Sequence, residues 1–488
     1  NFAGALKRRG FQCGQSVAIM LPNLPQTVIA FWGIIKAGGV VVMTNPLYRE
    51  KELVNNMNDS GAEYIILQAD LWAKVDSVRA KTPLRTFIVT NMEKESVAPI
   101  PYDDESVLSW QAFTEAGFRY SEAITDAEAP VLLQYTGGTT GTPKGVILTH
   151  RNLGANALQI LNFLNLLPRD HHVILGILPF FHVYGLTVCL VMSMISAATL
   201  LPLPKFDPRQ VLQTIARYKP TFFPGAPAMY HTLLQQKEIA SYDLKSIRIC
   251  MSGSAPLPRE IFNRFQQMTG ASILEAYGLT EASPVTHVTK LGMEGVKENS
   301  IGIPLPATDA RIVDMEVGSL TLEPGQLGEL VIRGPQVMKG YWHKDDETAN
   351  ALRNEWLYTG DIARMDEDGY FYIVDRKKDM VIVGGYNVYP REVDEVLLEH
   401  PKILEAVCVG LADDMRGEVL RAYIVPRQGE QITKSEVVGW CRKKLASYKV
   451  PRQVEFRDSL PKSIVGKILR QRLREEEDRR RAANTDKA

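Results

Sequence analysis

Short apolar runs alternate with segments of helical periodicity through the first part of the chain. The runs are bounded by turn-forming residues, as buried strands are, and the alternation favours a parallel sheet with helices on both faces. The predicted strands are 16–21, 40–44, 64–68, 131–133, 173–178, 221–223 (ended by Pro224-Gly225), 247–251 and 272–276. The predicted helices are 26–37, 50–57, 207–218 and 258–268.

From about residue 302 the pattern changes to short strands without helices, which predicts a β-rich subdomain over about 302–375. A mixed pattern follows, with strands at 381–383, 406–410 and 421–426 and helices at 390–400 and 435–445. We therefore expect an α/β protein. A large N-terminal domain, 1–375, holds parallel α/β sheets and the β-rich subdomain. A small mobile α+β domain, 376–472, follows a charged, exposed hinge at Asp375–Asp379. A charged tail covers 473–488, and we expect Glu475–Ala488 to be frayed.

An uncharged stretch in the middle of the chain and the N-terminal residues do not follow this strand–helix alternation. The stretch from Gly185 to Leu203 has no charged residue and is long enough to test as a membrane span. Its serine, threonine and proline residues favour a buried helix to about Ile195 followed by a buried strand. Residues 1–9 have the pattern of a helix end without a start signal, so we expect that the natural beginning of the chain is missing.

Composition narrows the class of protein. The 488 residues are 45% hydrophobic and 23% charged, which is typical of a soluble globular protein with two or three domains. Lys+Arg and Asp+Glu both total 56, so the net charge gives no field that would favour nucleic acid. The cysteines are odd in number and lack metal-type spacing, which indicates a reducing compartment. They are Cys13, Cys189, Cys250, Cys408 and Cys441.

The most informative stretch is Thr136–Gly145, which holds four glycines, four threonines and Lys144 after an apolar strand. Glycines leave backbone N–H groups open to an anion, threonine hydroxyls add donors, and the lysine adds positive charge. The stretch lacks the Gly-Lys-Ser/Thr ending of the P-loop. It predicts a polyphosphate-binding loop of another class, with a flexible linker as the alternative.

Two further segments have residues suited to a nucleotide. Tyr277–Glu281 follows a strand, and it offers an aromatic ring to stack on a base and a carboxylate to hold Mg²⁺. An ordinary strand turn is the alternative. Tyr358–Asp361 places an acid on a Thr-Gly turn, where a buried carboxylate would accept hydrogen bonds from ribose hydroxyls. A simple turn cap is the alternative there.

Three other segments indicate further chemistry. Pro179–Gly185 is an aromatic cluster around His182, and the uncharged stretch behind it suggests the wall of an apolar tunnel. A packed core histidine is the alternative. Gly384–Pro390 fits a turn leading into a helix. Lys467 lies on a glycine turn within Pro461–Arg470, where a surface charge is the alternative.

Together and in this order, the motifs resemble the adenylate-forming superfamily, from near residue 10 to about residue 472. Gly137 departs from the commonest form, which has serine there, but glycine is familiar among fatty-acid ligases. The segments Asn45–Tyr48, Phe180–Gly185 and Tyr277–Pro284 look most like bacterial long-chain fatty acyl-CoA synthetases. The resemblance implies ATP-dependent activation of a long- or medium-chain fatty acid to acyl-AMP. Thioester formation with coenzyme A follows and gives acyl-CoA, AMP and pyrophosphate.

The resemblance also implies the site residues. In it Tyr277 lies near the adenine, Thr280 binds the α-phosphate, Asp361 and Arg376 bind the ribose, and His182 orients the carboxylate or gates the tunnel. The ATP/AMP-binding residues are Thr136, Gly137, Gly138, Thr139, Thr140, Gly141, Lys144, Gly253, Ser254, Ala255, Glu275, Ala276, Tyr277, Gly278, Thr280, Asp361 and Arg376. Catalytic residues are Lys467, Lys378, Thr280 and Glu281, and Mg²⁺ ligands are Thr136 and Glu281. The acyl pocket holds His182, Val183, Tyr184, Gly185 and Gly278, and coenzyme A meets Gly384, Gly385 and Tyr386.

Two other functions stay open. One is another adenylating enzyme, such as a 4-coumarate- or aryl-CoA ligase, a luciferase-like oxygenase or a carrier-protein ligase. The other is a nucleotide-regulated lipid-binding protein without catalysis, against which Lys467 and Glu281 argue. The expected cofactors and partners are ATP, Mg²⁺, coenzyme A and a fatty acid, without nucleic acid. We expect a cytoplasmic enzyme, and we leave open a homodimer and peripheral association with the inner membrane face.

Overall fold

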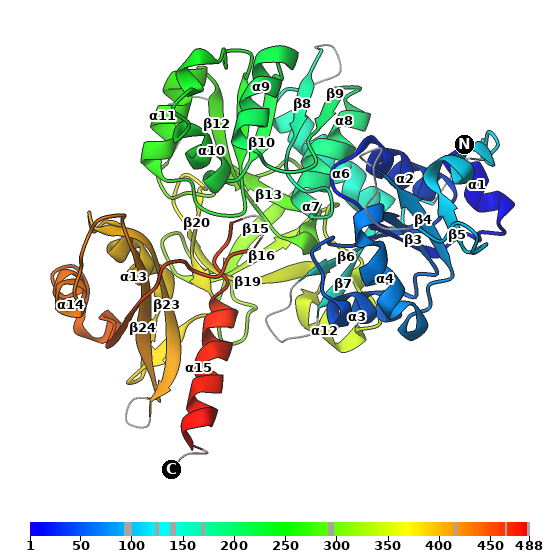
Figure 1. Ribbon diagram of the computed structural model, residues 1–488. Coiled ribbons are helices and arrows are strands. Elements are labelled where there is room, and N and C mark those ends of the chain that lie inside the picture. The colour runs from blue at the N-terminus through cyan, green and yellow to red at the C-terminus, as the bar shows by residue number, and fades with distance from the viewer. Residues whose placement is uncertain are drawn as a thin grey trace. The chain divides into compact units, whose positions relative to one another are not determined.

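The computed structural model describes residues 1–91, 100–122, 126–136, 143–166, 171–290, 297–413, 417–463 and 466–485 (Figure 1). The chain divides by compactness into two units. Unit 1 holds Asn1–Val296, Ile303–Asp309 and Arg333–Leu357, and unit 2 holds Lys297–Gly302, Ala310–Ile332 and Tyr358–Ala488. The expected β-rich segment is therefore shared between the units. The domain boundary expected at residue 375 stays a prediction.

Unit 1 begins with an eight-stranded sheet built on the expected apolar runs. Its order is β17-β7-β6-β2-β1-β3-β4-β5, with parallel pairing from β6 to β5 and antiparallel pairing of β7 and β17. The strands are β1 (Ser16–Met20), β2 (Val40–Met43), β3 (Tyr64–Gln68), β4 (Thr86–Thr90), β5 (Val107–Ser109), β6 (Pro130–Thr136), β7 (Lys144–Thr149) and β17 (Gly340–Tyr341). Its helices are α1 (Phe2–Arg8), α2 (Pro25–Lys36), α3 (Glu50–Ser60), α4 (Trp72–Val78) and α5 (Trp110–Glu115).

A seven-stranded sheet follows, in the order β14-β13-β12-β11-β10-β8-β9. It is parallel from β12 to β9, and Figure 1 shows α9, α10 and α11 around it. The strands are β8 (Val173–Gly176), β9 (Thr199–Pro202), β10 (Phe222–Gly225), β11 (Ile249–Ser252), β12 (Ser272–Gly278), β13 (Val285–Val288) and β14 (Ile303–Pro304). The helices of this part of the chain are α6 (His150–Phe163), α7 (Val183–Gly185), α8 (Met192–Ile195), α9 (Pro208–Tyr218), α10 (Pro227–Leu234) and α11 (Arg259–Thr269). A further helix of unit 1, α12 (Asp345–Ala351), contacts β17 of the eight-stranded sheet.

The uncharged stretch is buried within this part of unit 1. A π-helical segment, Leu186–Val191, continues from α7 into α8, and β9 follows as the expected strand. All six side chains of that segment are buried. Within the described ranges, every helix is too short or too polar to cross a bilayer. The interpretation as a buried helix and strand is confirmed.

Two smaller sheets complete the fold. The first has the order β15-β16-β19-β18 with β20 beside β19, and it confirms the expected short strands. It holds β15 (Asp309–Val313), β16 (Gly328–Arg333), β18 (Leu352–Arg353), β19 (Trp356–Met365) and β20 (Phe371–Arg376). The second has the order β22-β21-β24-β23 with β25 beside β24. It holds β21 (Val381–Val383), β22 (Tyr386–Val388), β23 (Ile403–Asp413), β24 (Gly417–Pro426) and β25 (Gln453–Phe456), with helices α13 (Pro390–Leu398), α14 (Lys434–Arg442) and α15 (Arg470–Thr485).

The C-terminal sheet is covered on both faces. Successive strand residues point to opposite faces, and β23 accordingly divides its apolar side chains between two clusters. Ala406 and Cys408 pack with residues of α13 and α14. Val407 and Val409 pack with Leu473 of α15 on the other face. Figure 1 shows α15 beside β24 and β23.

Four expectations about these elements were wrong. Pro224-Gly225 does not end β10, which runs to Gly225. Proline has no N–H to donate to a neighbouring strand. Here that causes no loss toward β8, because β10 pairs with β8 only at Phe222 and Ile174. Strand β12 continues through Tyr277 and Gly278, which pair with β13. Tyr358–Asp361 lies within β19 instead of a turn. Helix α12 occurs where no helix was expected, and its three acidic residues in the first turn suit the helix dipole.

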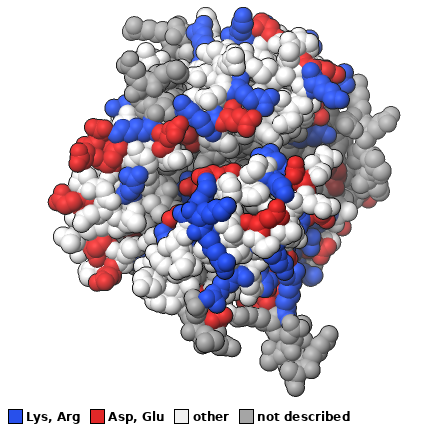
Figure 2. Space-filling view, turned by 90° about the vertical axis from the view of Figure 1, so that its left-hand side faces the viewer, with Lys and Arg blue, Asp and Glu red and all other residues white. Residues whose placement is uncertain are grey.

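The expectation that the charged tail is frayed was wrong for residues 475–485. Residues 470–485 form helix α15. Its acidic and basic side chains are paired with strands of unit 2, as described below. Figure 2 shows Lys and Arg interspersed with Asp and Glu over one face of the molecule, in line with the equal totals of the two kinds of charge.

Candidate active site

The described ends of the Gly/Thr loop are held together by the antiparallel pair β6–β7. Thr136 lies opposite Lys144 in this pair. The neighbouring strand β17 adds a hydrogen bond from the Trp342 N–H to the Gly145 carbonyl, 2.7 Å long. The loop residues Gly137, Gly138, Thr139, Thr140 and Gly141 lie outside the described residues. The loop therefore begins and ends at the paired end of two strands of the eight-stranded sheet.

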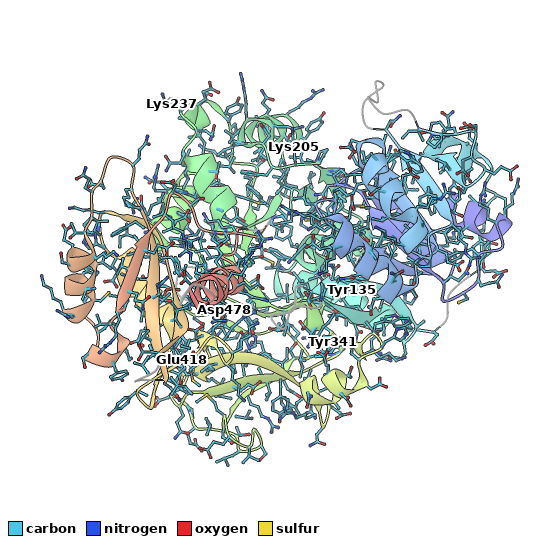
Figure 3. All side chains as sticks on the ribbon, turned by 60° about the horizontal axis from the view of Figure 1, so that its bottom comes forward. Tyr135, Lys205, Lys237, Tyr341, Glu418 and Asp478 are labelled. Carbon is cyan, nitrogen blue, oxygen red and sulfur yellow. The ribbon has the colours of Figure 1, made fainter. Side chains whose placement is uncertain are left out.

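Tyr341 of β17 connects two residues of the predicted phosphate site (Figure 3). Its hydroxyl donates to Glu281 Oε1 at 2.8 Å, and Lys144 Nζ lies 5.0 Å from its ring centroid. Burial, and then the charge of Glu281, raise the pKa of Tyr341, so its hydroxyl remains a donor. Lys144 also forms an ion pair with Glu347 of α12. The Glu347 carboxylate thus contacts Lys144, the lysine that the resemblance assigns to a phosphate.

Sequence reasoning missed Tyr341 and Glu347. Tyr341 is 60 residues from Glu281 in the chain, and neither residue stands in a motif that predicts a nucleotide contact. The contact depends on β17 pairing with β7, which a two-residue strand does not reveal in the sequence.

Thr280 and Glu281 occupy a short 3₁₀ turn, Thr280–Ala282, directly after β12. The Glu281 carbonyl accepts the Met338 N–H at 2.8 Å, which holds the turn in place. Tyr277 lies opposite His287 of β13, and their ring centroids are 5.9 Å apart. Tyr277, Thr280 and Glu281 are therefore brought to the carboxyl end of a parallel strand, where ligands bind in open sheets.

The loop Ser252–Pro256 lies at the end of the neighbouring strand β11. The Gly253 N–H donates to the Gly225 carbonyl at 3.2 Å, and a Cβ on Gly253 would come 2.9 Å from the Tyr184 ring. Ser254 has a φ of +72°. Glu275 of β12 accepts the Leu257 N–H at 3.0 Å and so holds the loop beside β12. The predicted set Gly253, Ser254, Ala255, Glu275 and Ala276 thus gathers on two adjacent strands.

The aromatic cluster is placed by buried packing. His182 caps α7, and its Nδ1 accepts the Tyr184 N–H at 3.3 Å. The Tyr184 hydroxyl donates to the Met251 carbonyl of β11 at 2.8 Å, and Val183 is buried. Gly185 must remain glycine, because a Cβ there would lie 2.4 Å from the Pro179 carbonyl oxygen.

Gly278 is packed in the same way. A Cβ there would lie 2.0 Å from the Pro284 carbonyl oxygen, so a side chain cannot be added without moving backbone. The roles of His182–Gly185 and Gly278 in an acyl pocket stay predictions. Larger residues at Gly185 or Gly278 would disturb folding and would not test a tunnel.

Unit 2 brings four other predicted residues into one charge cluster. Asp361 is buried, as expected, and its Oδ1 pairs with Arg376 Nε at 3.1 Å. Burial, and then Arg376, lower the pKa of Lys467 to about 8, while Asp361, Lys378 and Asp379 also act on it. Burial, followed by Arg376, lowers the pKa of Lys378 to about 8 too. Part of the Lys467 side chain is exposed to solvent, so screening by water limits how far these neighbours act on its ammonium.

The expected hinge is exposed only in part. Lys377 and Lys378 are exposed, but Asp375 and Asp379 are buried. Burial raises the pKa of Asp375, whose Oδ2 accepts the Arg391 N–H at the start of α13. The expectation of an exposed junction was therefore wrong for its two aspartates, because both accept hydrogen bonds from other elements of unit 2.

The predicted coenzyme A segment forms the hairpin between β21 and β22. Gly384 and Gly385 have φ values of +57° and +86°, which a tight hairpin turn requires and which glycine adopts without strain. Tyr386 is exposed and stacks on Tyr448, with centroids 4.6 Å apart. Pro390 begins α13, as predicted.

Comparison with known proteins accounts for this arrangement. Residues 1–342 match the family described as AMP-binding enzyme, and residues 392–467 match the AMP-binding enzyme C-terminal domain. The chain belongs to the AMP-binding enzyme family. This family membership confirms the resemblance drawn from the motifs.

Its relatives in this family align over almost the whole chain. The long-chain-fatty-acid–CoA ligase of Bacillus subtilis (strain 168) is 45% identical over 493 residues, covering 97% of this chain and 88% of that protein. The protein of the same description from Escherichia coli O157:H7 is 38% identical, covering 96% and 86%. ATP-bound MatB from Rhodopseudomonas palustris has a TM-score of 0.85 at 30% identity, covering 97% and 91%. The expected α/β fold is confirmed.

Proposed function

We propose that the protein is an ATP-dependent ligase that joins a long-chain fatty acid to coenzyme A. The observation that carries this proposal is the cluster of Lys467, Asp361 and Arg376, in which a lysine ammonium lies within electrostatic reach of the acid and guanidinium expected at a ribose. The choice of a fatty acid is supported by relatives described as long-chain-fatty-acid–CoA ligases, one of them 45% identical.

The first half-reaction is adenylation. A carboxylate oxygen of the acid bonds to the α-phosphorus of ATP, and the bond to the bridging oxygen breaks as pyrophosphate leaves with its electron pair. Negative charge increases on the phosphoryl oxygens. In the proposed reaction Thr280 and Lys144 of unit 1 and Lys467 of unit 2 would supply donors and positive charge to these oxygens, which is how proteins accelerate phosphoryl and nucleotidyl transfer.

The second half-reaction forms the thioester. The thiol of coenzyme A loses its proton and attacks the acyl carbon of the acyl-adenylate, and AMP leaves with the electron pair of the C–O bond. No side-chain nucleophile is needed. Gly384, Gly385 and Tyr386 are the proposed contacts of coenzyme A, and the exposed Tyr386 hairpin leaves backbone groups accessible to it.

The residues present fit Mg²⁺ as a companion of ATP. Tyr341 engages Glu281 Oε1, which leaves Oε2 as a hard oxygen ligand, and the Thr136 hydroxyl is a second oxygen. Among the described residues, no three His, Cys, Asp or Glu side chains gather to hold a metal by themselves. A Mg²⁺ held by one or two protein oxygens and by phosphates fits this set and would neutralise phosphate charge.

An acid panel tests the proposed function. Acids of graded chain length, together with 4-coumarate and benzoate, are assayed for AMP release with and without coenzyme A. We expect long-chain acids to give AMP and acyl-CoA in equal amounts, and aromatic acids to give little. Preference for an aromatic acid would favour the aryl-CoA ligase alternative.

Two other outcomes of the panel would contradict the proposal. Turnover without coenzyme A would favour a luciferase-like or carrier-protein reaction. Binding of ATP and fatty acid without AMP release would favour the lipid-binding protein. A homodimer, a cytoplasmic location and peripheral membrane association stay predictions.

A further inference from the structure

Helix α15 covers one apolar face of the C-terminal sheet. Leu473 is fully buried against Val407, Val409 and Tyr423, which lie on the face opposite α13 and α14. Leu460 and Ile468 pack in the same cluster. These two residues flank Lys467, so the helix and the lysine segment share a single apolar contact surface.

Buried charges fix the helix on that face. Glu477 is 5% exposed, accepts the Tyr423 hydroxyl at 2.9 Å and pairs with Arg421 at 2.5 Å. One turn on, Arg480 pairs with Glu455 of β25 at 2.8 Å. A buried carboxylate between a hydroxyl and a guanidinium holds only one register of the helix, because removing either partner strands a charge in the interior.

The start of α15 is tied to the other elements of the cluster. Arg470 pairs with the buried Asp394 of α13, and its Nε donates to the Cys408 carbonyl at 3.2 Å. Arg474 donates to Asp379 at 2.8 Å, next to Lys378. The helix therefore contacts both the sheet and the charged segment that surrounds Lys467.

Lys467 lies in a segment that leads directly into α15. Lys462 and Ile468 form a bridge, and the Leu469 N–H donates to the Pro461 carbonyl at 2.8 Å. Only two residues separate Lys467 from Arg470. Any shift of α15 along the sheet must therefore move Lys467.

We propose that α15 is a positioning element for Lys467, and that the buried Glu477–Tyr423–Arg421 cluster sets the place of the ammonium beside Asp361 and Arg376. This inference rests on the proposed function, in which Lys467 serves adenylation. Tyr423 and Glu477 are positioning residues, because they contact neither ATP nor the acid in the proposed reaction.

The test uses the full chain with Glu477→Gln, which removes the buried charge, and Tyr423→Phe, which removes one hydroxyl and leaves the packing. Asp478→Asn is the matched control, because Asp478 is exposed on the same helix (Figure 3). We measure acid-dependent ATP–pyrophosphate exchange, and separately the conversion of a supplied acyl-adenylate to thioester. We expect exchange to fall by up to about 10²-fold, the scale of a misplacement of roughly 1 Å. Thioester formation and the control should stay near wild type.

A second readout does not depend on activity. The rate at which an amine reagent modifies Lys467 is followed against pH by mass spectrometry. Burial, and then Arg376 and Lys378, lower the pKa of Lys467. Asp361 and Asp379 raise it. A displaced Lys467 should regain a higher pKa, so the labelling midpoint should move from about 8 to higher pH in both variants.

The outcomes separate the inference from the function. Unchanged exchange and labelling in both variants, or equal losses in the two half-reactions, would overturn the positioning role. A wild-type chain without exchange would refute the proposed function. In that case the labelling midpoint alone decides whether α15 positions Lys467.

Discussion

Replacing Lys467 with alanine is expected to lower acid-dependent pyrophosphate exchange by about 10²–10³-fold, the scale of removing one preorganised donor from a transition state. The ammonium stands in a cluster with Asp361 and Arg376, so its removal takes positive charge from the place where the α-phosphate gains negative charge. A supplied acyl-adenylate should still be converted to thioester, because the thiol attacks the acyl carbon in that step and the α-phosphorus is not attacked.

The pH dependence of exchange provides an internal check on this variant. The lowered pKa of Lys467, about 8, means that the ammonium loses its proton as pH rises through that value. Wild-type exchange should therefore fall on the alkaline side, and Lys467→Ala should lack this fall. Lys434→Ala, at an exposed lysine on α14, is the control for loss of one surface charge. Equal loss of both half-reactions in Lys467→Ala would contradict the assignment.

Replacing Lys378 with proline is expected to have the opposite effect, with exchange retained and acyl-CoA formation lost. The residues before and after Lys378 contact different elements of unit 2. Lys377 donates to the Gly360 carbonyl and pairs with Glu329 of β16, whereas Asp379 pairs with Arg474 of α15. A rotation of the lysine-bearing segment between half-reactions would pivot here, and it requires a large change of φ and ψ. Proline fixes φ near −65° and prevents that change.

The measurement for Lys378→Pro is exchange and acyl-CoA formation in the same preparation. Lys378→Ala is the matched control, because it removes the side chain and leaves the backbone free, so any loss that the two variants share belongs to the side chain. The hydrogen bond from the Arg391 N–H to Asp375 crosses the junction, and it must break if the pivot is here. Acyl-CoA formation that survives in Lys378→Pro would place the pivot elsewhere or rule out the rotation.

Much of the fold could be predicted because the buried parallel strands are apolar along their whole length. Strand β3, Tyr64–Gln68, matches the expected bounds residue for residue. Helix α15 could not be predicted in this way. Its composition indicates disorder when read alone, and it is ordered by Leu473 and by charges that meet partners on β24 and β25.

The candidate site shows the same division. Asp361 and Arg376 were expected at the same ribose, and they lie together because they are opposite residues of the antiparallel pair β19–β20. Tyr341, Glu347 and Glu477 were missed, because each contacts a side chain that lies far away in the sequence. The expected exposure of the hinge was wrong for Asp375 and Asp379 for the same reason.

The central claim is that the acid is activated as an acyl-adenylate, and an isotope transfer tests it most directly. Palmitate labelled with ¹⁸O in both carboxyl oxygens is converted with ATP and coenzyme A, and the AMP is analysed by mass spectrometry. If a carboxylate oxygen attacks the α-phosphorus, cleavage of the acyl C–O bond leaves one ¹⁸O in AMP and none in pyrophosphate. Unlabelled AMP, or label in inorganic phosphate formed together with ADP, would contradict adenylation.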